Sequence, residues 1–338
     1  MKTILVTGGA GFIGSHTVVE LQQSGYDVVI ADNLYNSDIE VLDKIEEITG
    51  KKPHFIKVDL SKTKECNLVF ETYNIDGIIN FAAFKAVGES CSMPIEYYKN
   101  NMNILLNLLD NMKRRDINYI VHSSSCTVYG EPDSLPIKEE SPTKKAESPY
   151  GNTKQMAEEV LSFVVQATDI NAIALRYFNP IGAHSSAKIG ELPRGVPNNL
   201  MPFITQTAIG KRKELVVFGD DYPTKDGTCI RDYIHVVDLA KAHIVALNRL
   251  FENKNKKPLE FFNIGTGNGF SVLDVIKSFE KTSNTKLNYK IGPRRKGDVI
   301  EIWADTSFAE KLLGWKAQKT LDEMTLSAWN WEKALSKK

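Results

Sequence analysis

The chain has 338 residues, of which 42% are hydrophobic and 25% charged, proportions that are ordinary for a soluble globular protein. Its 42 lysines and arginines balance 42 aspartates and glutamates, which excludes a broad basic field that would attract nucleic acid or an anionic membrane. This length allows a large core and predicts two domains.

The cysteines and the apolar runs indicate where the protein works. Cys66, Cys91, Cys126 and Cys229 are scattered and form no metal-type or redox pair. No apolar run approaches the length of a membrane span, and the apolar segment that begins at Ile4 leaves no room for a signal peptide. We therefore expect a cytoplasmic protein of the reducing cytosol, without a bound metal.

Residues 1–14 predict a strand, a glycine turn and the start of a helix. Residues 4–6 form an apolar run typical of a strand buried on both faces. Gly8, Gly11 and Gly14 follow with the spacing G-x-x-G-x-x-G, a variant of the dinucleotide fingerprint, and a helical pattern comes next. The free N–H groups and the positive dipole end of such a helix suit a pyrophosphate.

The second predicted strand, residues 27–31, ends in Asp32. A carboxylate at this place can accept hydrogen bonds from the adenosine ribose hydroxyls. We expect no Arg or Lys near it that could hold a 2′-phosphate, which favours NAD over NADP. The alternative is a tight turn with an incidental surface aspartate.

The rest of the first half alternates helices with strands. The pattern predicts a helix to about residue 49, a strand at 54–58, a helix at 62–73, a strand at 77–81, a helix from 93 or 94 to about 115, a strand at 118–122, a helix from about 149 and a strand at 172–175. This alternation is typical of a Rossmann-type, doubly wound parallel sheet of the α/β class. Ligands of such sheets lie beyond the carboxyl ends of the strands. The residues predicted at those ends are Gly8, Asp32, Asp59, Ala82, Ser125 and Asn179.

The composition changes at Pro180 toward Gly, Pro and loop residues. We therefore predict a dinucleotide-binding domain over residues 1–179, to which segments near 232–265 return. Residues 180–338 are predicted to form mainly a smaller α/β substrate domain that closes over the first.

The clearest chemistry lies in residues 148–154. Ser148 can cap a helix whose first position suits Pro149, and Tyr150 and Lys154 then share one helix face. Lowering the pKa of a phenol from about 10 to about 7 requires roughly 4 kcal/mol, and an ammonium about 6 Å away supplies about 2.8 kcal/mol at an effective dielectric near 20. A helix N-terminus and an oxidised nicotinamide could make up the difference. The alternative is a core tyrosine and a solvated lysine.

A series of motifs then identifies a family. In order along the chain these are T-G-G-A-G-F-I-G-S-H, D-N-L, K-A-V-G-E-S, Y-Y-K-N-N, S-S-S-C-T-V-Y-G, S-P-Y-G-N-T-K, R-Y-F-N-P-I-G-A-H, P-N-N-L-M-P, D-G-T-C-I-R-D-Y-I-H-V-V-D-L-A and P-R-R-K-G-D. With these motifs the chain resembles the extended short-chain dehydrogenase/reductase family and, within it, the UDP-hexose 4-epimerases, over nearly its whole length.

The resemblance implies an isomerase that interconverts UDP-galactose and UDP-glucose through a 4-keto sugar. Tyr150 would deprotonate the 4-hydroxyl while NAD accepts hydride from C4, and the keto sugar would turn over and take the hydride back on its other face. Ser125 would hydrogen-bond the same oxygen, and Lys154 would bind the nicotinamide ribose. Because the net redox change is nil, NAD should stay tightly bound.

The pattern and the resemblance together assign binding residues. The expected cofactor contacts are Gly8, Gly11, Phe12, Ile13, Gly14, Asp32, Asn33, Asn36, Ser37, Asp59, Leu60, Phe81, Ala82, Ala83, Lys85, Asn100, Ser123, Tyr150, Lys154 and Tyr177. The expected UDP-sugar contacts are Lys85, Ser125, Tyr150, Phe178, Asn179, Asn199, Leu200, Phe218, Arg231, Arg295, Asp298 and Ile302. His235 and Asp238 are expected to be structural.

The resemblance also separates related activities. Nucleotide-sugar 4,6-dehydratases carry Thr-Asp-Glu where Ser125-Cys126-Thr127 stand here, so dehydration is not expected. Related decarboxylases likewise need a carboxylate beside that position. Ile302 falls where many glucose- and galactose-restricted epimerases have a bulky Tyr, which leaves turnover of the N-acetylated UDP-hexoses open, as an additional or even the main activity.

Two further expectations concern partners. A non-catalytic, NAD-binding regulator is an alternative of a different class, against which the retained Tyr150, Lys154 and Ser125 argue. The family pairs the helix at about 94–115 and the helix after Pro149 into a homodimeric four-helix bundle. We therefore predict a homodimer, although the second domain could cover these helices instead.

Overall fold

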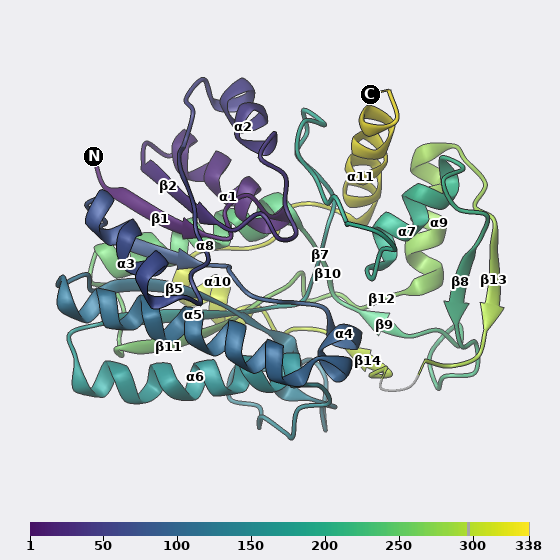
Figure 1. Cartoon of the computed structure of the whole chain (residues 1–338). Coiled ribbons are helices and arrows are strands. Elements are labelled where there is room, and N and C mark those ends of the chain that lie inside the picture. The colour runs from purple at the N-terminus through teal and green to yellow at the C-terminus, as the bar shows by residue number, and fades with distance from the viewer. Residues whose placement is uncertain (296–297, 338) are drawn as a thin grey trace.

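The computed structural model describes residues 1–295 and 298–337. Its centre is a parallel sheet of seven strands in the order β11-β6-β5-β4-β1-β2-β3 (Figure 1). These strands are β1 Thr3–Thr7, β2 Asp27–Asp32, β3 His54–Lys57, β4 Gly77–Asn80, β5 Tyr119–Ser125, β6 Asn171–Tyr177 and β11 Leu259–Ile264. The predicted fold class is therefore confirmed, and the chain returns to the sheet with its late strand β11.

Helices cover both faces of this sheet, which makes a three-layer domain. One face packs against α1 Phe12–Gln23, α2 Val41–Thr49, α8 Val236–Phe251 and α10 Ser307–Leu313. The other face packs against α3 Thr63–Thr72, α5 Pro94–Arg114 and α6 Pro149–Ala167.

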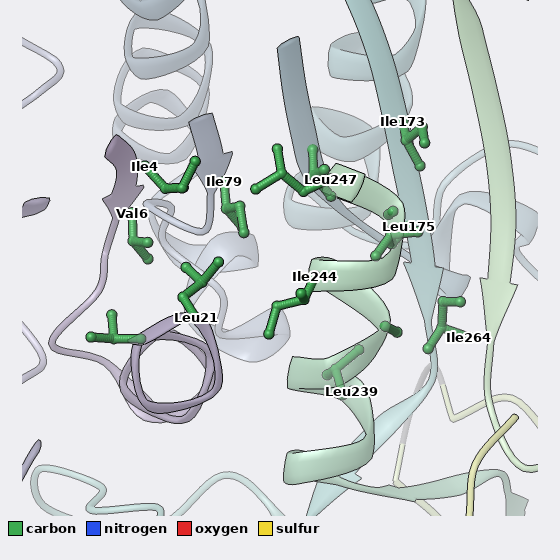
Figure 2. Close-up of a cluster of buried hydrophobic side chains, with 14 of the residues drawn as sticks. Ile4, Val6, Leu21, Ile79, Ile173, Leu175, Leu239, Ile244, Leu247 and Ile264 are labelled. Carbon is green, nitrogen blue, oxygen red and sulfur yellow. The ribbon is translucent and has the colours of Figure 1, made fainter. Parts of the chain in front are cut away.

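The two cores follow from the alternation of side chains along each strand. Ile4 and Val6 of β1 point into the layer of α1 and α8, whereas Leu5 points into the layer of α3, α5 and α6. Figure 2 shows the first of these cores, where Leu21 of α1 and Leu247 of α8 belong to one cluster with strand residues such as Ile79. Each core buries residues of four or more elements, so the strand ends are held in fixed relative positions.

The remaining segments form a smaller unit at one side of the sheet (Figure 1). It contains the helices α7 Leu200–Ala208, α9 Val272–Ser283 and α11 Leu321–Leu335, and the parallel strand pair β8 Leu215–Phe218 and β13 Tyr289–Gly292. Short strands connect it to the sheet region: β7 Asn179–Ile181, β9 Ile230–Arg231, β10 Tyr233–His235, β12 Phe270–Ser271 and β14 Glu301–Ile302. The exact domain boundaries stay a prediction.

The strand ends differ from the sequence-based prediction at the place that matters most. The predicted ends at residues 122 and 175 are wrong, because β5 continues to Ser125 and β6 to Tyr177. The ladder continues because residues 123–125 pair with residues 175–177 in register. In the other direction, β3 and β4 each end one residue before the predicted end.

Two short helices in the first half of the chain were not predicted, and no helices were predicted after residue 180, where the structure has α7 to α11. The helix α4 spans Val87–Ser92, and a 3-10 helix, η1, spans Cys126–Tyr129 directly after β5. Among the helices that the structure describes, none has both the length and the apolar character needed to cross a membrane.

Candidate active site

The glycine turn after β1 brings two strand ends into close contact with the start of α1. Gly8 has φ +66°, and a Cβ added to it would lie 3.0 Å from the backbone nitrogen of Ala82, which follows β4. A Cβ on Gly14 would lie 2.3 Å from the carbonyl oxygen of Gly8, so neither position accepts a larger residue without displacing the backbone.

The start of α1 fits a pyrophosphate. Its N-cap, Gly11, supplies no side-chain cap, and the first turn holds no acidic residue. The first turn itself therefore offers the N–H groups of Phe12 and Ile13 no side-chain acceptor, and it holds no acidic residue that would neutralise the positive end of the helix dipole. The donor chemistry of the turn thus agrees with the predicted dinucleotide site.

Asp32 lies at the end of β2, beside the same turn. Its carboxylate accepts hydrogen bonds from the N–H of Ala10 at 3.1 Å and of Leu34 at 2.8 Å, and from the hydroxyl of Ser37 at 3.0 Å. The Asp32 side chain thereby joins the glycine turn to the loop after β2. This places an acceptor where a ribose next to the pyrophosphate would lie.

No Arg or Lys was expected near this loop. None stands close to Asp32 in the sequence, but the folded chain brings one arginine to the loop. Arg194, from the distant segment before α7, donates to the backbone carbonyl oxygens of Tyr35 and Ser37. Tertiary folding brings it there, so no local sequence pattern could indicate it. Since both of these guanidinium nitrogens already have carbonyl acceptors, Arg194 fixes the loop in this structure.

The start of α6 presents the predicted catalytic pair. The Ser148 hydroxyl accepts a hydrogen bond from the N–H of Gly151 at 3.1 Å, and Pro149 is at the first helical turn, which confirms the predicted cap. Tyr150 and Lys154 lie on the same helix face, with the lysine Nζ 5.8 Å from the centre of the phenol ring. The ammonium donates to the backbone carbonyl of Ser123 at 2.6 Å, so it joins α6 to the end of β5.

The pKa values correct one part of the sequence-based argument. Burial raises the pKa of Tyr150 to about 12, and a hydrogen bond with Ser125 offsets only part of this effect. Burial also lowers the pKa of Lys154 to about 8. The sequence argument left out this desolvation, which disfavours the charged form of both groups. The chain alone therefore does not lower the pKa of Tyr150. For Tyr150 to act as a base near neutral pH, further positive charge must lie close to its phenol.

Serines at the end of β5 surround this pair. The Ser125 hydroxyl accepts a hydrogen bond from the N–H of Thr127 at 3.2 Å and so caps η1. The Ser123 hydroxyl forms a hydrogen bond with the hydroxyl of Tyr177. Burial raises the pKa of Tyr177 as well. Ser123, Ser125 and Tyr177 are thus gathered on one edge of the sheet next to Tyr150.

The predicted diphosphate- and ribose-binding residues are also brought together. Asp298 accepts a hydrogen bond from Nη2 of Arg295 at 2.6 Å and lies 3.8 Å from Nη2 of Arg231. The Arg295 guanidinium lies 5.7 Å from the centre of the Phe218 ring, whose residue is 43% exposed. Lys296 and Gly297 of the P-R-R-K-G-D motif lie outside the described residues.

This cluster is connected to the end of β5 through β9 and β14. Ile302 pairs with Arg231 across the two strands and is only 4% exposed. It packs in one cluster with Phe178 and with Cys126, the residue after Ser125. A surface cavity of about 290 Å³ lies beside β14 and is lined in part by Glu301 and Trp303. None of the predicted site residues lines this cavity.

Glu191 joins predicted cofactor and substrate residues, and the sequence analysis did not single it out. Glu191 accepts a hydrogen bond from Nδ2 of Asn199 at 2.6 Å, and its carboxylate lies 3.7 Å from Nζ of Lys85. Lys85 is half exposed, whereas Glu191 is largely buried. Glu191 therefore connects a predicted cofactor contact with a predicted substrate contact.

Other predicted residues make mainly local bonds. Asp59 accepts from the N–H and hydroxyl of Ser61, as a turn-forming aspartate does, and the Asn100 amide donates to Asn101. His235 caps α8 by accepting from the N–H of Val237, and Asp238 accepts from two backbone N–H groups at residues 318 and 319. These bonds match the structural role expected for His235 and Asp238.

Comparison with known proteins decides the family. The sequence profile of the family described as GDP-mannose 4,6 dehydratase matches residues 5–327. The chain is 50% identical to the UDP-glucose 4-epimerase of Drosophila melanogaster, over 98% of this chain and 96% of that protein. The chain belongs to the UDP-glucose 4-epimerase family.

Solved structures of this family agree with the fold in detail. A UDP-glucose 4-epimerase from Stenotrophomonas maltophila, with bound NAD and formylated UDP-arabinopyranose, has a TM-score of 0.96 at 45% identity and covers 100% of this chain and 99% of its own. The epimerase from Bifidobacterium longum, in complex with NAD+ and UDP, has a TM-score of 0.94 at 48% identity and 98% coverage of both chains.

The dehydratase description of the profile does not extend to the chemistry of this epimerase-family chain. No carboxylate stands at Cys126 or Thr127, the positions that carry acids in dehydratases. Burial raises the pKa of the Cys126 thiol to about 12, so this group does not replace them as an acid or base near neutral pH.

Proposed function

We propose that this protein is an NAD-dependent UDP-hexose 4-epimerase that interconverts UDP-galactose and UDP-glucose through a 4-keto intermediate. The observation that carries the proposal is the arrangement of Tyr150 and Lys154 on α6 against Ser123 and Ser125 at the end of β5. The family membership of the chain supports the same reaction and the same cofactor.

The cofactor residues fit NAD. Gly11, Phe12 and Ile13 would hold the pyrophosphate with backbone N–H groups, and Asp32 the adenosine ribose. When bound, NAD supplies the oxidation of the sugar at C4 and the later reduction, together with a positive charge near Tyr150. Lys154 would hold the nicotinamide ribose.

The residues of the chain move and hold the proton. The Tyr150 oxygen takes the proton of the 4-hydroxyl as C4 is oxidised and gives it back when C4 is reduced. The Ser125 hydroxyl hydrogen-bonds the same sugar oxygen and keeps it aligned with the phenol. Because the same group takes the proton and later returns it, the protein's net protonation is unchanged over the full cycle.

The second unit would hold the UDP moiety. The guanidinium forks of Arg231 and Arg295 suit a diphosphate, since each carries a permanent charge and several donors. In the structure both lie beside Asp298, which would accept from the uridine ribose, and Phe218 would lie against uracil. Asn179 and Asn199 would add amide contacts.

The function is tested with the purified protein and no added cofactor. We expect NAD to copurify and UDP-galactose to be converted to UDP-glucose, because a reaction with no net redox change does not consume the cofactor. Matched incubations with UDP-N-acetylgalactosamine define the range of substrates. A protein that holds NAD but converts none of these UDP-hexoses would contradict the proposal and would favour a regulator.

Ile302 is proposed to set the tolerance for N-acetylated sugars. Its side chain is buried beside Phe178. We infer that a larger tyrosine in its place would reduce the space for a 2-N-acetyl group. We expect Ile302→Tyr to lower kcat/KM for UDP-N-acetylglucosamine at least about tenfold while changing that for UDP-galactose by less than about threefold. Equal rates of the variant and the wild type with the N-acetylated substrate would contradict this role.

We further propose that the protein is a homodimer that pairs α5 and α6 of each copy. Apolar residues stay exposed on these helices: Ile95 at 62% and Leu106 at 48% on α5, Met156 at 36% and Phe163 at 65% on α6. Residues eleven apart on α5 and seven apart on α6 fall on one helix face, so each helix offers an apolar stripe.

The dimer is tested by Phe163→Glu. This substitution places a charge in the proposed interface but leaves the buried face of α6 unchanged, so we expect the mass in solution to fall by half in light scattering. Leu68→Glu is the control, because Leu68 is similarly exposed, at 47%, on α3 outside this stripe. An unchanged mass of the Phe163 variant would contradict the proposed interface.

The compartment is proposed to be the cytosol. All four cysteines are free, and Cys91 among them is exposed. Free thiols of this kind are typical of a reducing compartment.

A further inference from the structure

A buried ion pair lies directly behind the catalytic serines. Arg176 of β6 donates from Nε to Oε1 of Glu158 at 2.9 Å and from Nη2 to Oε2 at 2.7 Å. The two side chains are only 6% and 8% exposed. Glu158 also accepts a hydrogen bond from the Ser124 hydroxyl at 2.6 Å.

The pair joins the three elements that carry the catalytic groups. Ser124 stands between Ser123, whose carbonyl oxygen accepts from the Lys154 ammonium, and Ser125. Glu158 follows Lys154 by one helical turn on α6, and Arg176 precedes Tyr177 on β6. A shift of this pair would therefore move β5, β6 and α6 relative to one another.

Arg176 itself is held firmly. Its Nη1 donates to the Tyr129 hydroxyl at 3.0 Å and to the carbonyl oxygen of Glu139 at 3.1 Å. Its guanidinium also lies 4.4 Å from the centre of the Phe261 ring. These contacts fix the position of the Glu158 carboxylate from the sheet side.

Electrostatics gives Glu158 a second connection to the site. Burial lowers the pKa of Lys154, and the nearby Glu158 carboxylate opposes that effect. Other titratable groups of these elements include His122 on β5 and Tyr150 on α6, which both lie near Lys154. On β6 they include Arg176, bonded to Glu158, and Tyr177, bonded to Ser123. His122 has a pKa well below its usual range because it is buried, so it adds no charge near neutral pH.

Stability alone does not account for this arrangement. Burying an ion pair removes both charges from water, which costs free energy. Replacing such a pair by apolar residues therefore often leaves the stability of the protein unchanged or raises it. Here, however, the pair is bonded to the strand end that carries the catalytic groups, and it adds a charge one turn from Lys154.

We propose that Glu158, held by Arg176, is a positioning residue of the reaction: it fixes the end of β5 against α6 and supplies a negative charge one helical turn from the Lys154 ammonium. It acts through Ser124 and Lys154 and touches neither substrate nor cofactor. This inference rests on the proposed epimerase function.

The chain contains a matched control for the test. Arg249 of α8 and Glu260 of β11 form an equally buried pair, with Nε–Oε2 at 2.6 Å and Nη2–Oε1 at 3.0 Å. Among the described residues, this pair makes no hydrogen bond to a predicted site residue. It joins α8 to β11, and Arg249 also donates to the carbonyl oxygen of Leu312. Glu260→Gln thus removes the same kind of charge from a buried pair that likewise joins a helix to this sheet, away from the chemistry.

The experiment compares Glu158→Gln with Glu260→Gln in the NAD-bound enzyme. Both variants leave a buried arginine uncompensated, so similar losses of thermal stability are expected. We expect only Glu158→Gln to lower kcat for UDP-galactose, at least about tenfold, with KM within about threefold, because the catalytic groups are displaced. Glu260→Gln should keep kcat within about twofold of the wild type.

A pH profile and a spectrum separate positioning from general damage. Without the Glu158 charge, and with Arg176 uncompensated, the pKa of Lys154 should fall, so the alkaline limb of log kcat should move at least about one pH unit lower. The Tyr150 phenolate absorbance at neutral pH should also decrease, because a larger fraction of Lys154 is then neutral. Neither readout should change in Glu260→Gln.

A second variant keeps the inference testable if Glu158→Gln does not fold. Ser124→Ala removes only the hydroxyl that Glu158 holds, and we expect it to lower kcat about fivefold or more through the displaced strand end. Equal kcat and equal pH profiles in the Glu158 and Glu260 variants, or wild-type kcat in Ser124→Ala, would overturn the inference while the epimerase function stands. An inactive wild type would overturn both.

Discussion

Replacing Tyr150 by phenylalanine is expected to lower kcat for UDP-galactose at least about 1,000-fold while NAD stays bound. The substitution removes only the phenolic oxygen, which is the group that takes the proton of the 4-hydroxyl. The glycine turn and Asp32, which would hold the adenosine half of the cofactor, are unchanged. The measurement is kcat per mole of bound NAD, together with the NAD content of the purified variant.

Tyr98→Phe is the control for this substitution. Tyr98 lies on α5, and its hydroxyl donates to the side chain of Asn152 at 2.7 Å. Asn152 lies on α6, two residues after Tyr150. Loss of the Tyr98 hydroxyl disturbs the start of α6 without touching the proposed chemistry, so kcat should stay within about threefold. Turnover by Tyr150→Phe at the wild-type rate would refute the assignment of the base.

Replacing Lys154 by methionine is expected to lower kcat at neutral pH at least about 100-fold. Methionine keeps much of the length of the buried side chain but removes the ammonium that donates to Ser123 and lies 5.8 Å from the Tyr150 ring. Without this cation the phenolate is less stable, so the pKa of Tyr150 in the cofactor complex should rise.

The direction of the pH effect makes the Lys154 prediction specific. In the wild type, activity should fall at alkaline pH as Lys154 loses its proton, since burial already lowers its pKa to about 8 in the chain alone. In the methionine variant this alkaline limb is absent and the acid limb moves to higher pH, so the deficit should shrink as pH rises. A deficit that is constant across the profile would show that the lysine acts only as a structural group.

The local parts of the fold and site were predictable because short patterns determine them. The strand at residues 4–6, the glycine turn and the cap formed by Ser148 and Pro149 each depend on neighbours in the sequence, and the structure has them as expected. Tyr150 and Lys154 share a helix face for the same reason. The alternation of strands and helices was enough to predict the parallel sheet.

The parts that the sequence did not reveal depend on contacts between distant segments. The pKa of Tyr150 is set by burial under other elements, and Arg194 reaches the loop after β2 only in the folded chain. The extension of β5 to Ser125 depends on its pairing with β6. Glu158 was not predicted either, because its role depends on Arg176 and Ser124, which approach it only in the folded chain.

The central claim is that Tyr150 becomes a base at neutral pH only through positive charge near its phenol, and a titration tests it directly. The phenolate absorbance of the wild type minus that of Tyr150→Phe is followed against pH, with the bound NAD either oxidised or reduced. The account predicts one phenolate with a pKa near about 7 when NAD is oxidised, and a pKa well above it when the positive ring is neutralised. A difference spectrum with no phenolate below about pH 10 in the oxidised enzyme would contradict the account.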